Sequence, residues 1–512
     1  MSYRGGKYSI ERILALDEYT QKHSRLHTIL VCVTCFLPAE CFIISQEAVP
    51  LEDPALGWRE NYGFWVRAAL VIGAVLYTAT IQAKYLLQDF VISYRQLLAL
   101  LICVVVVQMI LAVTFAANVW FPIPFTVITL VPAFYVVSIT SICVVVGIPV
   151  IPQQFMAVIY PAYQVLFHAA NTINTSYQLP VILLLPVIKL VVKNIALRCV
   201  THLEDMMPEA VIFTVDFFNA LYMATSMESA TSTSTVMIIV LIDIIQSATV
   251  LFRLHRRTAT ILPRLKEVVG SLEGDLSLLS AACQIISLSS ENRDLLNRLE
   301  AVPRTGSLQQ RRRSAPNNKP DEFKKDAVFE KCRKISKGAT WVERRDQSRN
   351  GPSIKRESQT SVQNENAIVT QHKGILRESL EVMFTVECIL LSAFLDAFVP
   401  FFYGIFMYVM VNFQSAKYHS ELTGVTAETI GDVIDSIFVF AVVELVALSL
   451  LAAVIYRNLG MNAAYHLAFV LETQTELIQS KLLGWVTMTL AFRVVHFANF
   501  VQVSTFPSSS HG

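Results

Sequence analysis

The sequence predicts an all-α protein, a polytopic transmembrane bundle of about ten or eleven spans with a partly disordered cytosolic insert. Three observations favour this class. Hydrophobic residues make up 54% of the 512 residues and charged residues only 16%, with a mean hydropathy of +0.50. Apolar stretches of about 20 residues, long enough for a helix to cross a bilayer, recur along the chain. One long basic segment between them has almost no apolar periodicity, which is typical of a disordered loop.

Eleven apolar stretches are candidate spans. They cover residues 26–45, 64–85, 97–119, 124–147, 155–171, 178–197, 209–227, 234–253, 382–412, 433–456 and 481–502. In the ninth stretch, Pro400 either kinks one span or separates two half-spans. The expected divisions are a cytosolic N-terminal segment (1–25), a first bundle of about eight spans (26–257), a heptad segment (258–302), a basic disordered loop (303–373), a second bundle of about three spans (374–502) and a C-terminal tail (503–512).

The charges between the spans predict the orientation. Residues 303–373 carry seventeen Lys or Arg against eight Asp or Glu, a net charge of +9. Short connections on the same side are also basic, at Lys84, Lys193 and Arg253, whereas residues 46–61 hold four acids and one Arg. Because cytosolic loops are enriched in Lys and Arg, we expect the N-terminus and the 258–373 insert in the cytosol. The plasma membrane and internal membranes are both compatible with the sequence as locations.

Two modification sites are candidates. Asn174 begins an N-x-S/T sequon on the predicted non-cytosolic side and is a glycosylation candidate. Ser314 lies three residues after Arg311 and two before Pro316, a spacing that fits a kinase site and a phosphopeptide-binding adaptor. The alternative for this segment is a solvated tail near anionic lipid.

Residues 265–286 follow an apolar heptad pattern over about three heptads. The pattern predicts a helix with one apolar seam. The seam either joins a second copy of the protein, as a homo-oligomer, or packs on this chain or on the membrane surface.

Ionisable residues inside the predicted spans are the candidate functional groups. A charged side chain at the centre of a span costs about 2.5 to 3.5 kcal/mol, so each such residue is a candidate for a polar or ion path. The candidates are Asp216, Asn219, Asp243, Gln246, Glu387, Asp396, Glu444, Arg493 and His496, with Lys189 as a further partner.

Helical spacing groups these candidates into faces. Asp216 and Asn219 share one face of their span, and Asp243 and Gln246 form a polar stripe on the next. Glu387 and Asp396 are nine residues apart, which is a rotation of roughly 180° along a helix, so at most one of them joins a shared site. Arg493 is expected to pair with a carboxylate, either Glu444 or Glu387, of which Glu444 is favoured. The alternative interpretation is that these groups only join helices through buried ion pairs and hydrogen bonds.

Two stretches, "LEDMMPEAVIFTVDFFNALYM" and "YHLAFVLETQTELIQSKLLGWVTMTLAFRVVHF", resemble a large family of multi-pass membrane proteins of oomycetes. The likeness covers about residues 200–257 and 380–500. The resemblance implies residence in a membrane. It implies no activity, substrate or cofactor, because the family has none assigned.

The sequence leaves two functions open. The first is a solute or proton-coupled ion transporter that uses the intramembrane carboxylates. The second is a non-transporting scaffold or sensor that acts through the basic insert. No catalytic motif, metal-ligand spacing or cofactor site is present in the sequence, so no enzyme activity is expected, and the basic loop lacks the aromatic residues of a nucleic-acid site. The lipid bilayer is the expected partner.

Overall fold

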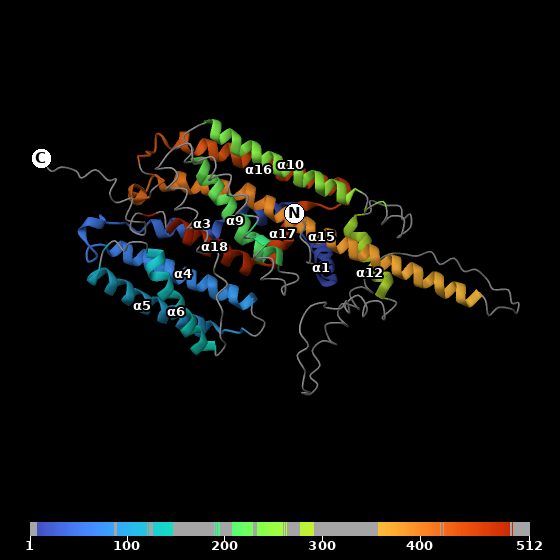
Figure 1. Ribbon diagram of the computed structural model, residues 1–512, viewed down its shortest axis with the longest axis horizontal. Coiled ribbons are helices and arrows are strands. Elements are labelled where there is room, and N and C mark those ends of the chain that lie inside the picture. Colours follow the sequence, from blue (N-terminus) through green and yellow to red (C-terminus); the bar gives the residue numbers. More distant parts are fainter. Residues whose placement is uncertain are drawn as a thin grey trace. The chain divides into compact units, whose positions relative to one another are not determined.

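The protein is built from helices (Figure 1). The computed structural model describes residues 8–86, 90–119, 121, 126–146, 189, 191, 193–194, 207–228, 233–259, 261, 263, 277–290, 357–419, 421–422, 424–491 and 494. Within these residues the chain forms no strand, only an isolated antiparallel bridge between His419 and Val494. The predicted all-α class is confirmed.

Five helices are long and apolar enough to cross a membrane. These candidate spans are Arg25–Glu47, which comprises α2 (Arg25–Thr34) and α3 (Leu37–Glu47), Tyr62–Tyr85 within α4 (Tyr62–Leu86), α5 (Tyr94–Asn118), Gly374–Met410 within α15 (Glu357–Met410), and α16 (Ile430–Leu459). Four further helices lie where the sequence predicts spans, namely α6 (Thr126–Val146), α9 (Met207–Glu228), α10 (Thr233–Thr258) and α18 (Thr475–Ala491). The spans predicted at 155–171 and 178–197 lie outside the described residues, apart from Lys189, Val191, Lys193 and Asn194.

The chain forms two compact units. The first comprises Met1–Ser24, Val250–Glu387 and Ala452–His466, and the second comprises Arg25–Thr249, Cys388–Leu451 and Leu467–Gly512. The first unit contains α1 (Ile10–Lys22) packed on α12 (Leu278–Ser290). Both units are assembled from segments distant in sequence.

Several helix ends have the capping residues that their sequence predicts. The Ser9 hydroxyl accepts a hydrogen bond from the backbone N–H of Arg12 at the start of α1 (3.1 Å). At the start of α5, Ser93 and Gln96 form a capping box, in which each side chain accepts from the other's backbone N–H. α16 ends at Leu459, and the next residue, Gly460, has a φ of 64°, in the left-handed region that glycine adopts without strain.

α15 settles one alternative that the sequence left open and differs from the prediction at its start. It continues through the buried Pro400 as one helix, so the two alternatives for this stretch resolve to a single span. It also begins at Glu357, inside the 303–373 segment that we expected to be disordered throughout. The helix therefore extends well beyond the apolar run that predicted it.

Exposed apolar side chains mark the faces that contact lipid. On α5, Ile102 and Ile110 are 58% and 60% exposed, whereas Leu100 and Val104 are fully buried on the other side. α16 likewise exposes Val439 and other valines and leucines along one side. In water such exposed apolar stripes would be unfavourable, whereas in contact with lipid hydrocarbon they cost little free energy. The protein is therefore an integral membrane protein.

Contacts along α18 give the relative directions of its neighbours in the second unit. Lys84, near the end of α4, contacts Glu476 at the start of α18, so α4 and α18 are antiparallel. On α9, the Lys481 ammonium donates to Thr214 (2.9 Å), and the Trp485 ring packs one turn further on against Phe218. α9 and α18 therefore run in the same direction. Both relations agree with the alternation of the predicted spans.

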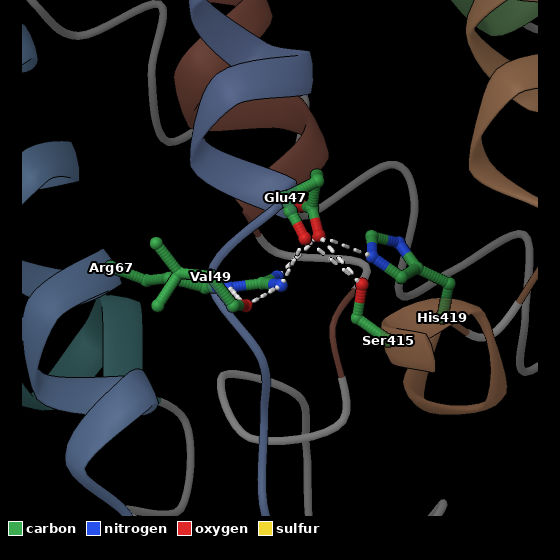
Figure 2. Close-up of polar contacts among 5 residues, drawn as sticks. All are labelled: Glu47, Val49, Arg67, Ser415 and His419. Atoms are coloured by element: carbon green, nitrogen blue, oxygen red, sulfur yellow. Dashed lines mark hydrogen bonds and ion pairs between the residues drawn. The ribbon is translucent and has the colours of Figure 1, made fainter. Parts of the chain in front are cut away.

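A buried ion-pair network joins two connections between helices of the second unit (Figure 2). The Arg67 guanidinium binds the Glu47 carboxylate and donates to the backbone carbonyls of Glu47 and Val49. The Glu47 carboxylate also contacts His419 Nε2 (3.1 Å) and the Ser415 hydroxyl (3.5 Å). This network fixes the end of α3 and the start of α4 to the segment after α15. One carboxylate meets one guanidinium, so the charges of the network balance.

We expect Arg67→Gln to lower the free energy of unfolding by about 3 to 5 kcal/mol, because it leaves the Glu47 carboxylate buried without its cation. Unfolding in mixed micelles with increasing denaturing detergent would measure the change. Arg59→Gln is the matched control, since Arg59 is exposed on the same connection and should change stability by less than about 0.5 kcal/mol. Equal stability of the two variants would contradict a structural role for the network.

We expect Gly484→Ala on α18 to destabilise the bundle by about 1 to 3 kcal/mol. A Cβ atom at this position would lie 2.7 Å from Thr78 Oγ1 and 3.2 Å from Thr78 Cβ on α4, so the helices would have to separate. Gly374→Ala is the control, because no atom lies within 4 Å of its added Cβ and helix propensity should then raise stability by up to about 1 kcal/mol. The same unfolding assay distinguishes the two, and a stabilising Gly484→Ala would refute the close approach.

Candidate functional site

The candidate site is organised around α9, the most enclosed helix of the second unit. Every side chain from Pro208 to Ala224 is buried. The sequence of this helix explains why, since large apolar residues occur on all of its sides. Asp216, near its middle, has no exposed surface, and Asn219 is 7% exposed. The predicted common face of these two residues therefore points into protein.

Two lysines neutralise Asp216. Lys193 Nζ lies 2.8 Å from Asp216 Oδ2, and Lys189 Nζ lies 3.2 Å from Oδ1. The lysines are four residues apart, so on a helix they share one face. The sequence predicts Lys189 as a partner, but it assigns Lys193 to a basic connection outside the membrane. That assignment is wrong, because Lys193 is buried beside Asp216.

Asp396 of α15 joins the same group. Lys189 Nζ lies 3.7 Å from Asp396 Oδ1, so one ammonium contacts two carboxylates. Pro400 lies one turn further along α15 and has no backbone N–H, which deprives the Asp396 carbonyl of its helical donor. A polar backbone atom is thus released next to the ionised side chains.

Asp243 of α10 and Glu444 of α16 form a pair of carboxyl groups. Their carboxyl groups lie near enough to each other, and to the carboxyl group of Asp396, for the charges to interact. Glu444 is buried, and Asp243 Oδ2 is enclosed without a hydrogen-bond partner among the described residues. Two neighbouring carboxylates repel each other when both are ionised, which favours a proton on one of them.

We call these six residues the carboxylate–lysine cluster. They are Lys189, Lys193, Asp216, Asp243, Asp396 and Glu444. Among the described residues four carboxyl groups face two ammonium groups, so these six residues would carry a formal charge of −2 if every group were ionised. Uncompensated charge is strongly unfavourable in a buried site, so such an excess favours the binding of protons or cations. Carboxylate oxygens also suit hard metal cations, although the lysine ammonium groups already occupy Asp216.

The other predicted candidates lie at different places in the structure, and some lie outside the described residues. Asn219 lies beside Asp216 on α9, and its Oδ1 has no hydrogen-bond partner among the described residues. Gln246 is exposed on the outer side of α10 and does not face the cluster. The described partner of Glu444 is Asp243, whereas the predicted partner Arg493, like His496, lies outside the described residues. Asn174 and Ser314 also lie outside them.

Glu387 belongs to a separate network in the first unit. Its carboxylate binds Arg12 Nη2 (2.9 Å) and His466 Nε2 (3.0 Å). Tyr8 is hydrogen-bonded to His466 (3.3 Å), and burial raises the pKa of its hydroxyl well above the usual value. The expectation that Glu387 and Asp396 cannot share a site agrees with their different partners. The sequence offers no signal for Arg12 and His466, because neither lies near Glu387 in the chain.

The described part of the heptad segment is buried within the chain. Leu279, Cys283 and Ile286 on α12 are enclosed in the first unit, where α12 packs on α1. The described part of the seam therefore packs on this chain, which is one of the alternatives expected for it. A homo-oligomer through 265–286 stays a prediction, since residues 264–276 lie outside the described chain.

We expect Asp216→Asn to lower the free energy of unfolding by about 3 to 5 kcal/mol, because it removes the carboxylate that Lys189 and Lys193 share and leaves Lys189 with only the longer contact to Asp396. Gln246→Ala on the exposed side of α10 is the control and should change stability by less than about 0.5 kcal/mol. Unfolding in denaturing detergent measures both. If Asp216→Asn were as stable as the wild type, the lysines would not depend on Asp216.

Comparison with protein-family models, with curated proteins and with solved structures gives no match to the chain.

Proposed function

We propose that the protein is a proton-coupled transporter whose ion path passes through the carboxylate–lysine cluster. The observation that carries the proposal is the excess of carboxyl groups over lysines among the described residues of a buried site, where two of the carboxyl groups lie close together. Intramembrane ionisable groups that face the bundle interior commonly form proton relays in transporters. A group that must carry a proton to be stable where it lies is suited to proton exchange.

The two halves of the cluster have different roles in this proposal. Asp243 and Glu444 bind and release the proton, because two neighbouring carboxyl groups repel each other unless one of them is protonated. Asp216 stays ionised, because two ammonium groups contact it. When the proton leaves, the two carboxylates repel each other and the cluster gains a negative charge.

Lys189 is the group that can respond to this change. It contacts both Asp216 and Asp396, at 3.2 and 3.7 Å, so a small movement of its side chain transfers it from one carboxylate to the other. Proton release in this scheme draws Lys189 toward the newly negative side of the cluster. The redistribution alters the contacts between the Lys189 segment, α9 and α15, which is the kind of two-state change that alternating access requires.

The alternative is a membrane scaffold or sensor that acts through its basic insert, with the cluster serving only to join helices. Buried ion pairs do join helices in membrane proteins, and no substrate is needed for that role. A scaffold also predicts charge balance, as in the Glu47 network, and not an excess of carboxyl groups. Charge imbalance is the feature that favours transport.

Proton flux into proteoliposomes under an imposed pH gradient tests the proposal, with mixtures of small solutes added to either side. We expect flux in the wild type and at least a tenfold loss in Glu444→Gln, which replaces the proton-binding carboxyl by an amide of similar size. Gln246→Ala on the same span as Asp243 is the matched control and should retain flux.

Chromatography must show equal folded protein for all three forms. Flux that survives unchanged in a folded Glu444→Gln protein would remove Glu444 from the path. Absence of flux in the wild type under every solute condition would favour the scaffold, and deletion of 303–356 would then be the variant to compare.

A further inference from the structure

Three arginines lie at the adjoining ends of two lipid-facing helices. Arg253 and Arg256 are in the last turns of α10, and Arg457 is in the last turn of α16. All three side chains are exposed. Arg253 and Arg256 are three residues apart and are therefore neighbours on the helix surface.

Hydrogen bonds hold the two helix ends together within the first unit. Asn458 Nδ2 donates to Thr258 Oγ1 (2.8 Å) and to His255 Nδ1 (3.0 Å). Arg457 precedes Asn458, while Arg253 and Arg256 flank His255 in the chain, so the three arginines lie within one helical turn of the residues that join the two helix ends. Figure 1 shows α10 and α16 side by side up to these ends.

The arginines have no acidic partner among the described residues, and none of them takes part in a described ion pair. Lys84 near the end of α4, by contrast, pairs with Glu476. Three exposed guanidinium groups at the joined ends of two helices give a local excess of positive charge, which attracts anions. Guanidinium groups bind phosphate through paired hydrogen bonds, which makes phosphate the best match.

Aromatic and apolar side chains beside the arginines indicate a lipid as the source of the phosphate. Phe252 on α10 is 65% exposed and Tyr456 on α16 is 59% exposed, each directly before an arginine. Exposed aromatic side chains at the end of a span are typical of the headgroup level of a bilayer. Towards the middle of each span the exposed residues are aliphatic, such as Leu241 and Val446, which suits acyl chains.

We propose that Arg253, Arg256 and Arg457 form a binding site for the phosphate headgroup of an anionic phospholipid, whose acyl chains lie along α10 and α16. Phe252 and Tyr456 lie at the headgroup level. The site does not depend on the proposed transport function, since it uses none of the cluster residues.

Native mass spectrometry of the purified full-length protein in neutral detergent tests the site, with phosphatidylglycerol and phosphatidylcholine of identical acyl chains as probes. We expect the wild type to bind phosphatidylglycerol more tightly. The R253Q/R256Q/R457Q variant should lose on the order of a hundredfold in affinity for it, from about fivefold per arginine, and keep its affinity for phosphatidylcholine.

Two further variants separate charge from folding. Replacing all three arginines by lysine keeps the charge and should retain the preference for phosphatidylglycerol. Arg59→Gln removes an exposed arginine that lies over Trp58 on the connection between α3 and α4, and should leave binding unchanged. Each variant must elute as folded protein.

Two results would overturn the proposal. One is an unchanged preference for phosphatidylglycerol in the folded R253Q/R256Q/R457Q protein. The other is displacement of phosphatidylglycerol by glycerol phosphate at equal concentration, which would show that the arginines recognise a soluble phosphate and gain nothing from the acyl chains.

Discussion

Burial of the Asp216 carboxylate is the constraint on which the structure of the second unit depends. α9 is enclosed on all sides, so this charge cannot reach water by a change of side-chain rotamer. Removing a carboxylate from water costs several kcal/mol unless a cation and hydrogen bonds replace the solvent. Lys189 and Lys193 supply both, and Lys189 extends the contact to Asp396. One ionised group thereby ties three segments of the chain together.

The balance of charge distinguishes the buried networks from one another. Glu47 has Arg67 and Glu387 has Arg12, with histidines and hydroxyl groups as further neutral or weakly basic partners. Those two networks need no further charge and explain how connections and the N-terminal helix are held in place. The carboxylate–lysine cluster has two more carboxyl groups than lysines among the described residues. A structural role alone gives no reason for that excess.

The sequence predicts the helices well because hydropathy over about 20 residues is a local property. It also identifies Asp216, Asp243, Asp396 and Glu444 as candidates, because charge inside an apolar run is visible without a structure. It does not predict which of them meet. Arg12 and Glu387 are 375 residues apart, and the sequence around each residue does not indicate the other as its partner.

Lys193 shows a second limit of the sequence. A lysine near the end of an apolar run is equally compatible with the membrane surface and with a buried carboxylate, and the positive-inside rule favoured the surface. The helical start of α15 was missed for a related reason, since charge and low hydropathy indicate disorder even where a helix forms. In both cases a partner distant in the chain decides the outcome.

The central claim is that Asp243 and Glu444 share a proton inside the bundle. Infrared spectroscopy of the protein in lipid at neutral pH measures this directly, through the carbonyl stretch of a protonated carboxyl group and its shift in heavy water. The account predicts such a band in the wild type and its loss in the folded Asp243→Asn, Glu444→Gln double variant. A wild-type spectrum without the band, or a band unchanged in the double variant, would contradict it.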